Sequence, residues 1–424
     1  MPVADFGALV ENSLRMSAPN PSKLHRVAVT AAGVASPLGH GLEETARSLR
    51  EGRDGVSAVT RFDVSKTRCK TAGQLFHAGA ENGETETGSR RRGASRLHPA
   101  SVFMIEAARE LQAMDPGFRP ELTVIGTTSG GMSFGEAFYK AQVEKRRPRQ
   151  RAMWLANYLP QKAVLDAQQA CGFASPSQII ANACASGTNA IGHAFALVRS
   201  GQCRRILCGG YDIISEMVFA GFDSLQASTP EKIRPFDKNR TGLVLGEGAA
   251  LLALEAWESA RERGASILAE ITGYGISTDN HHLTQPHPSG IGPRQAMERA
   301  LAEARLAPGD IDYINAHGTA TAFNDATEGA AISQVFGSRV PVSSTKSMMG
   351  HALGGAGAIE AVFSILAIRD QFLPPNIHFQ EPDPAWPLNV VANAARAARV
   401  RRVVSNSFGF GGTNASIVLE EAAP

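Results

Sequence analysis

Short apolar runs alternate with longer segments of helical periodicity along most of the chain. Runs of this kind are typical of strands buried in a sheet, and the helical segments between them would cover that sheet. The alternation therefore predicts an α/β fold. The strand-like runs are residues 26–34, 122–130, 204–210, 267–275, 310–318 and 401–408.

Three pieces of sequence recur in the same order in the two halves of the chain. Because a single match arises easily by chance and three ordered matches do not, the pattern favours a duplicated architecture. We predict an N-terminal tail over residues 1–26, a first half over 27–255 and a second half over 256–424. The matching pieces are residues 123–131 and 312–321, residues 179–202 and 340–371, and residues 204–212 and 401–409.

Composition and charge exclude several classes of protein. Of the 424 residues, 42 are basic and 40 acidic, so no overall field favours nucleic acid or a membrane as the main partner. No apolar run is long enough to span a bilayer, and the N-terminus does not resemble a signal peptide. Five cysteines without dense spacing indicate a reducing compartment, and we expect a cytoplasmic protein.

One cysteine lies in an unusual place. Cys184 stands in "NACASGTNAIGHA", between an apolar strand and an apolar helix. At a helix N-terminus, unpaired N–H groups and the helix dipole favour a thiolate, so we expect a lowered thiol pKa and a nucleophile. The alternative, an inert buried thiol, is what we expect for the other four cysteines, Cys69, Cys171, Cys203 and Cys208.

Two histidines and a lysine follow predicted strands in the second half. Open α/β sheets gather their active-site groups at such strand ends, so His317, His351 and Lys346 could meet Cys184. Each histidine alone is equally consistent with a structural role. The spacing offers no His-x-x-x-His or Cys-rich ligand set, and we expect no metal.

A glycine-rich run, "SFGFGG", lies near the C-terminus. It lacks the Gly-x-x-x-x-Gly-Lys-Ser/Thr pattern, and no helical segment follows it, so phosphate binding is a poor interpretation. The glycines would instead let the backbone approach a substrate, with Phe410 as an apolar gate. A simple glycine-rich turn is the alternative.

Together these motifs resemble those of the elongating β-ketoacyl-acyl-carrier-protein synthases, which have the thiolase fold. The resemblance runs from about residue 26 to 420 and rests on "NACASGTNAIG", "RPFDKNRTGLVLGEGAALLALE", "NAHGTATAFND", "STKSMMGHALGGAGAIEA" and "NSFGFGGTN". It implies two duplicated halves in a five-layer αβαβα arrangement. It also implies a homodimer, or a heterodimer with a related subunit, that works on acyl- and malonyl-loaded carrier protein.

The resemblance assigns roles to individual residues. Cys184 would accept an acyl chain, while His317 and His351 would assist decarboxylation of the malonyl group and stabilise the resulting enolate. Backbone N–H groups of Cys184 and Phe410 would form an oxyanion hole. The supporting residues are Lys346, Glu360 and Phe408. No cofactor is implied, because the thioester and carboxylate already carry the reactivity.

Two positions depart from the family pattern, Thr241 in place of Asp and Ala322 in place of Pro. They leave the reaction class intact and favour a specialised pathway, so fatty-acid elongation and a type II polyketide or polyene pathway both stay open. The rival hypothesis is a non-catalytic, scaffolding subunit of a heteromeric complex. The intact cysteine and histidines argue against it.

A basic segment, "YKAQVEKRRPRQR", is the predicted docking patch. Most such runs are solvated faces, but carrier proteins are acidic, and a basic patch would steer their encounter with the enzyme. The residues are Lys145, Arg146, Arg147, Arg149 and Arg151.

Overall fold

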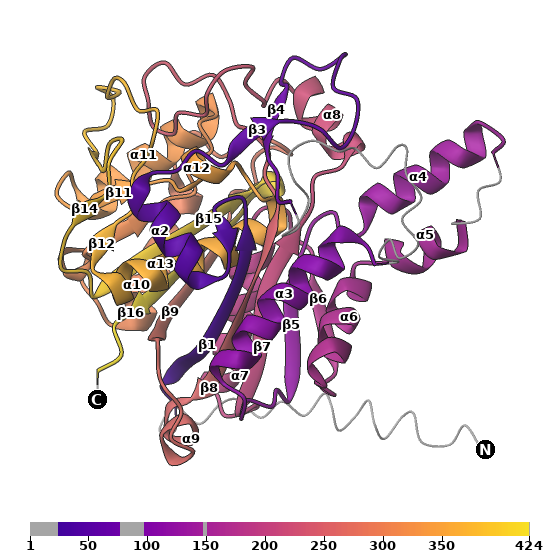
Figure 1. The fold of residues 1–424 in the computed structure, drawn as a ribbon. Helices are drawn as coiled ribbons and strands as arrows, with labels where there is room; N and C mark the ends of the chain where they lie inside the picture. The colour runs from indigo at the N-terminus through magenta and orange to yellow at the C-terminus, as the bar shows by residue number, and fades with distance from the viewer. Residues whose placement is uncertain (1–23, 77–96, 147–150, 424) are drawn as a thin grey trace, which may run out of the picture.

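A sheet of 12 strands runs through the computed structural model, which describes residues 24–76, 97–146 and 151–423 (Figure 1). The strand-like runs of the sequence all contribute to it. In spatial order the strands are β13 (Asn389–Val390), β11 (Pro341–Ser343), β10 (Tyr313–Asn315), β15 (Arg402–Gly409), β16 (Thr413–Glu420), β9 (Ala269–Thr278), β1 (Val27–Ser36), β8 (Gly248–Ala256), β7 (Arg205–Asp212), β5 (Leu122–Gly126) and β6 (Ser177–Ile180), with β2 (Gly39–His40) paired to β1.

Apart from β13 at one edge, the two halves of the sheet have the same order of strands from edge to middle. In one half β6, β5 and β7 are parallel neighbours, followed by antiparallel β8 and β1. In the other half β11, β10 and β15 are parallel neighbours, followed by antiparallel β16 and β9. Strands β1 and β9 join the halves, with Val27 opposite Ile271. The repeated pieces of sequence therefore occupy equivalent strands, while the residue boundary at 256 stays a prediction.

Helices form three layers: one between the two halves of the sheet and one on each outer face. The helices α7 (Ser186–Arg199) and α13 (Ala356–Asp370) contact each other and strands of both halves, so they form the central layer. One outer layer contains α3 (Pro99–Met114) and α6 (Gln161–Cys171), and the other α10 (Ile291–Ala304) and α11 (Ala322–Phe336). This is the expected αβαβα arrangement.

The two central helices meet near their N-termini through glycines. A Cβ atom on Gly187 would lie 2.8 Å from the carbonyl oxygen of Gly354, and one on Gly357 would lie 2.0 Å from Oγ1 of Thr188. Larger side chains would force the helices apart. Residues 356–368 of α13 are all buried, as expected for a helix that is apolar on every side. The close approach brings two helix N-termini to one place.

The remaining elements surround this core. Helices α4 and α5 pack on each other and project from the body, at the right of Figure 1. No helix in the described ranges is both long and apolar enough to cross a bilayer. These elements are α2 (Leu42–Glu51), β3 (Val56–Ala58), β4 (Thr71–Gly73), α4 (Met132–Val143), α5 (Arg151–Tyr158), α8 (Glu216–Ser224), α9 (Trp257–Glu262), η2 (Pro308–Asp310), α12 (Lys346–Met349), η3 (Leu353–Gly355), β12 (Phe372–Leu373), β14 (Arg396–Ala397) and η4 (Phe410–Gly412).

Most of the predicted tail, residues 1–23, lies outside the described residues. Residues 24–26 have no regular secondary structure, and β1 begins at Val27. The tail itself stays a prediction.

Candidate active site

The structure brings Cys184, His317 and His351 together. Cys184 lies between β6 and α7, His317 follows β10, and His351 follows α12. The Cys184 sulfur and one ring nitrogen of each histidine all lie within 4.8 Å of one another. The two imidazole rings are 5.2 Å apart at an interplanar angle of 85°. Strand ends from both halves therefore meet at one site, although the catalytic roles of these residues stay a proposal.

A strained turn presents Cys184 ahead of helix α7. Ala183 has φ of +57°, a left-handed conformation that costs a non-glycine residue about 1 kcal/mol or more. The Oγ atom of Ser186 accepts a hydrogen bond from the Asn182 N–H at 2.9 Å and donates one to the Ala183 carbonyl at 2.6 Å. The hydroxyl thus closes the turn and holds the sulfur at the helix entrance.

The electrostatic state of Cys184 differs from the prediction. Burial raises the pKa of the Cys184 thiol to about 11, against opposing effects of Lys346 and of backbone hydrogen bonds from Phe410 and Cys184 itself. We expected a lowered pKa from the helix N-terminus alone, and that prediction was wrong. The loss of hydration outweighs the favourable dipoles, so the resting group is a neutral thiol.

Both histidines are neutral as well. Burial is the main cause that lowers the pKa of His317 and of His351 well below 6.5, and the nearby charge of Lys346 adds to it. The Nδ1 atom of His317 and both ring nitrogens of His351 have no hydrogen-bond partner among the described residues. Neutral imidazoles with free nitrogens can donate a hydrogen bond to a bound substrate or accept one from it.

The charge of Lys346 is balanced within the site. Its Nζ atom lies 2.5 Å from Oε1 of Glu360, and each side chain is 1% exposed. Burial raises the pKa of Glu360 to about 7, although the lysine acts in the opposite direction. The predicted pair is thus in place beside the histidines.

A cavity of about 440 Å³ opens above these groups. The Phe410 ring stacks on Phe222, with ring centroids 5.6 Å apart, and both line the cavity. The buried ring of Phe408 lies 6.0 Å from that of His317. The lining is mixed: these phenylalanines form an apolar part of the wall, while Arg240, Thr241 and Asp279 are among its polar residues. After "SFGFGG" comes strand β16, consistent with the argument against a phosphate loop.

Comparison with known proteins decides the family. The model of the β-ketoacyl synthase N-terminal domain matches residues 24–260, and that of the C-terminal domain matches residues 268–380. The chain belongs to the β-ketoacyl synthase family. It is 37% identical to 3-oxoacyl-[acyl-carrier-protein] synthase 2 of Staphylococcus aureus over 415 residues, which cover 94% of this chain and 99% of the relative.

Solved structures of β-ketoacyl synthases agree with this assignment. The ishigamide ketosynthase/chain length factor is 34% identical, with a TM-score of 0.85 over 94% of this chain and all of that one. The ketosynthase ApeO in complex with its chain length factor ApeC, from Xenorhabdus doucetiae, is 27% identical, with a TM-score of 0.78 over 95% of this chain and 99% of that one.

In this β-ketoacyl synthase, two buried carboxylates that sequence reasoning missed hold the backbone around His317. Glu328 accepts hydrogen bonds from the N–H groups of His317 and Gly318 at 2.8 and 2.7 Å. Asp325 accepts one from the N–H of Ala320, whose φ is +64°. The signal in the sequence was the pair of acids in "FNDATEG", on a helix whose other residues are mostly uncharged.

A third missed carboxylate lies at the end of β7. Asp212 accepts hydrogen bonds from the N–H groups of Thr128 and Ser129 at 2.8 Å and from that of Gly354 at 2.7 Å. Burial raises its pKa, and the surrounding donors oppose that effect. Asp212 thereby ties the turn after β5 to the start of α13.

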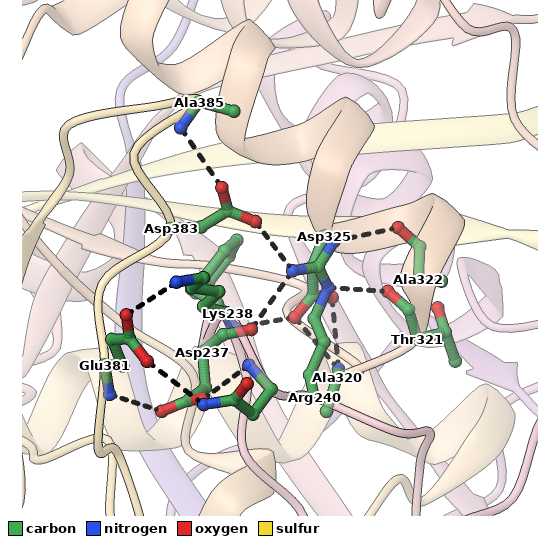
Figure 2. Close-up of polar contacts among 12 residues, drawn as sticks. Asp237, Lys238, Arg240, Ala320, Thr321, Ala322, Asp325, Glu381, Asp383 and Ala385 are labelled. Carbon is green, nitrogen blue, oxygen red and sulfur yellow. Dashed lines mark hydrogen bonds and ion pairs between the residues drawn. The ribbon is translucent and has the colours of Figure 1, made fainter.

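Arg240 connects three loops at the mouth of the cavity (Figure 2). Its guanidinium donates to the Ala322 carbonyl and to the Asp383 carboxylate, both at 3.1 Å, and lies 5.0 Å from the Trp386 ring. The neighbouring Thr241, one of the departures from the family pattern, lines the cavity and hydrogen-bonds through Oγ1 to the hydroxyl of Thr229 at 2.6 Å. Ala322 lines it as well.

Only part of the predicted docking patch lies among the residues that the structure describes. Lys145 and Arg146 are exposed just after α4, and Arg146 forms an ion pair with Glu144. Arg147 and Arg149 lie outside the described residues, as does the side chain of Arg151 at the start of α5. The patch stays a prediction.

Proposed function

We propose that this chain is a 3-oxoacyl-acyl-carrier-protein synthase that extends an acyl chain held on Cys184. The observation that carries the proposal is the convergence of one thiol and two neutral imidazoles at one cavity, which phenylalanines also line. A thiol supplies the nucleophile, and uncharged N–H donors stabilise negative charge that develops on a carbonyl oxygen.

In the first stage, the Cys184 sulfur attacks the thioester carbonyl of acyl-carrier protein. The new carbon–sulfur bond forms as the bond to the carrier's thiol breaks, and the proton of Cys184 leaves with that thiol. Because burial raises the pKa of Cys184 to about 11, proton removal accompanies attack rather than preceding it. The backbone N–H groups of Cys184 and Phe410 receive the oxyanion.

In the second stage, the malonyl group on its carrier protein loses carbon dioxide and becomes an enolate. His317 and His351, through neutral N–H groups, stabilise the enolate oxygen, and Lys346 with Glu360 keeps the local charge balanced. The enolate carbon attacks the acyl carbonyl, the carbon–carbon bond forms, and Cys184 leaves as a thiolate that takes up a proton.

We place this reaction in the cytoplasm, in fatty-acid elongation or a related type II polyketide or polyene pathway. The partners are acyl- and malonyl-loaded carrier protein, whose acidic surface suits the predicted basic patch. A second copy of the chain or a related subunit completes the assembly, and the Xenorhabdus doucetiae complex is a precedent for the latter.

The test is mass spectrometry of the intact protein after incubation with acyl-loaded carrier protein. We expect one acyl group on the wild type, none on a folded Cys184→Ala variant, and an unchanged adduct on the Cys203→Ala control, whose thiol lies outside the site. Malonyl-loaded carrier protein should then release a 3-oxoacyl product. A folded wild-type sample that stays unacylated supports the scaffolding hypothesis instead.

A further inference from the structure

The Cys184, His317 and His351 side chains form a set of metal ligands that their spacing in the sequence does not reveal. They are 6%, 2% and 1% exposed, and one ligand atom from each lies within 4.8 Å of the other two. The Nδ1 atom of His317 and both ring nitrogens of His351 have no partner among the described residues. The set is therefore preassembled, with free lone pairs.

The chemistry of these ligands selects among metal ions. One sulfur and two imidazole nitrogens suit Zn²⁺, which binds them at about 2.3 and 2.0–2.1 Å in tetrahedral geometry. Mg²⁺ and Ca²⁺ require oxygen ligands and are not suited. Ligand atoms around tetrahedral zinc lie roughly 3.5 Å apart, so the side chains need to move by only about 1 Å. The cavity supplies room for water as the fourth ligand.

We propose that Cys184, His317 and His351 bind one zinc ion, and that this zinc-bound form of the enzyme cannot be acylated. On binding, the ion replaces the thiol proton, which passes to solvent, and no electron is transferred. The sulfur lone pair that would attack a thioester is then shared with the metal. Both imidazoles lose the nitrogen that would face the enolate.

The positive charge of Lys346 opposes a bound cation. The Glu360 carboxylate offsets that charge, because its Oε1 lies 2.5 Å from Nζ of Lys346. Zinc binding follows from the geometry of the three ligands alone. Inhibition of acylation by zinc rests on the proposed function.

The experiment is titration of the metal-free full chain with Zn²⁺, followed by calorimetry and by alkylation of Cys184 with iodoacetamide. We expect one zinc per chain and at least about 100-fold weaker binding in Cys184→Ala. Zinc should slow alkylation of Cys184 in the wild type, a chelator should restore the rate, and Mg²⁺ should have no effect. Circular dichroism checks that each variant is folded.

Two control variants separate this site from other thiols and histidines. Cys203→Ala removes a thiol outside the cluster, and His287→Ala removes a half-buried histidine that packs on His281 with ring centroids 4.9 Å apart. Both should keep the tight zinc and the protection of Cys184. Absence of stoichiometric binding, or equal binding by Cys184→Ala, would overturn the proposal. Zinc binding that depends on Cys184, in a protein that never becomes acylated, would instead refute only the proposed function.

Discussion

The two halves of the molecule share one strand–turn–helix arrangement but place different side chains on it. In the first half, β6 leads through a tight turn to Cys184 and the central helix α7. In the second half, β11 leads through Lys346, α12 and His351 to the central helix α13. Equivalent backbone positions thus carry a thiol in one half and a lysine and an imidazole in the other.

The comparison shows that duplication of the fold supplies the geometry. The central helices approach so closely at Gly187 and Gly357 that the segments preceding them meet. The side chains at that meeting point differ between the two halves. Each half holds an alanine in the left-handed conformation near the site, Ala183 and Ala320, and the second half adds a buried ion pair, Lys346 with Glu360.

The largest expected effect comes from removal of the nucleophile while the second half stays intact. Cys184→Gln should lower condensation by at least about 1,000-fold and still decarboxylate malonyl-carrier protein, because His317 and His351 are unchanged. Product analysis by mass spectrometry and release of labelled carbon dioxide measure the two steps. If both activities disappear in a folded variant, the proposed division between the halves is wrong.

The contact between the halves is tested at Gly187. In Gly187→Ala, the new methyl group would lie 2.8 Å from the backbone oxygen of Gly354, which cannot rotate away. We expect a loss of about 3 kcal/mol in the free energy of unfolding, together with a lower kcat.

Denaturant titration measures the stability of this variant. The matched control is Gly221→Ala in α8, where an added Cβ meets no atom within 4 Å. That change should be neutral or stabilising by up to about 1 kcal/mol, since alanine favours a helix. Equal stability of the two variants would mean that the helices separate without cost.

Burial lowers the pKa of His98 in the first half, as it lowers those of His317 and His351 in the second. The Nδ1 atom of His98 accepts from the Ala100 N–H at 3.1 Å, and burial lowers the pKa of His98 to about 4. Since the unfolded chain binds this proton near pH 6.5, stability is lost as the pH falls from 6.5 toward 4.

His98→Gln should therefore reduce that acid-dependent loss by about 2 kcal/mol. Urea unfolding at several pH values provides the measurement, with the exposed His282→Gln as control. Parallel pH profiles for wild type and His98→Gln would contradict the argument.

The smallest effect concerns the surface of the first half. Reversal of charge at Arg146 and Arg147 should raise KM for carrier-bound substrates by roughly 3- to 10-fold, because steering by a basic patch acts mainly on encounter. A small thioester such as an acyl-N-acetylcysteamine should be used equally well by variant and wild type. An equal change for both substrates would remove the docking role.

Much of the fold and the site could be predicted from the sequence. Apolar runs mark strands, because a strand buried on both faces has few polar positions, and the ordered repeats indicated the duplication. The same reasoning predicted that His317, His351 and Lys346 could meet Cys184 at strand ends. Glu360 came from family resemblance, and its 2.5 Å contact with Lys346 agrees with it.

The carboxylates that hold the site could not be predicted in this way. Asp212 and Gly354 are 142 residues apart in the sequence, and Arg240 and Asp383 are 143 residues apart. Nothing in the local pattern around an acidic residue tells which distant backbone N–H it will meet. Glu328 lies only 11 residues from His317 in the sequence, so its contact with the His317 backbone was easier to predict than that of Asp212.

The order of strands and helices and the identity of the reactive groups were therefore determined by the sequence itself, because they depend on local patterns of polarity and on residue type. The protonation of those groups was decided only by the tertiary structure. A thiol at a helix N-terminus is expected to ionise readily, yet the surrounding protein removes its water and raises its pKa to about 11. Hydration is lost through packing of the whole chain, and no short stretch of sequence encodes it.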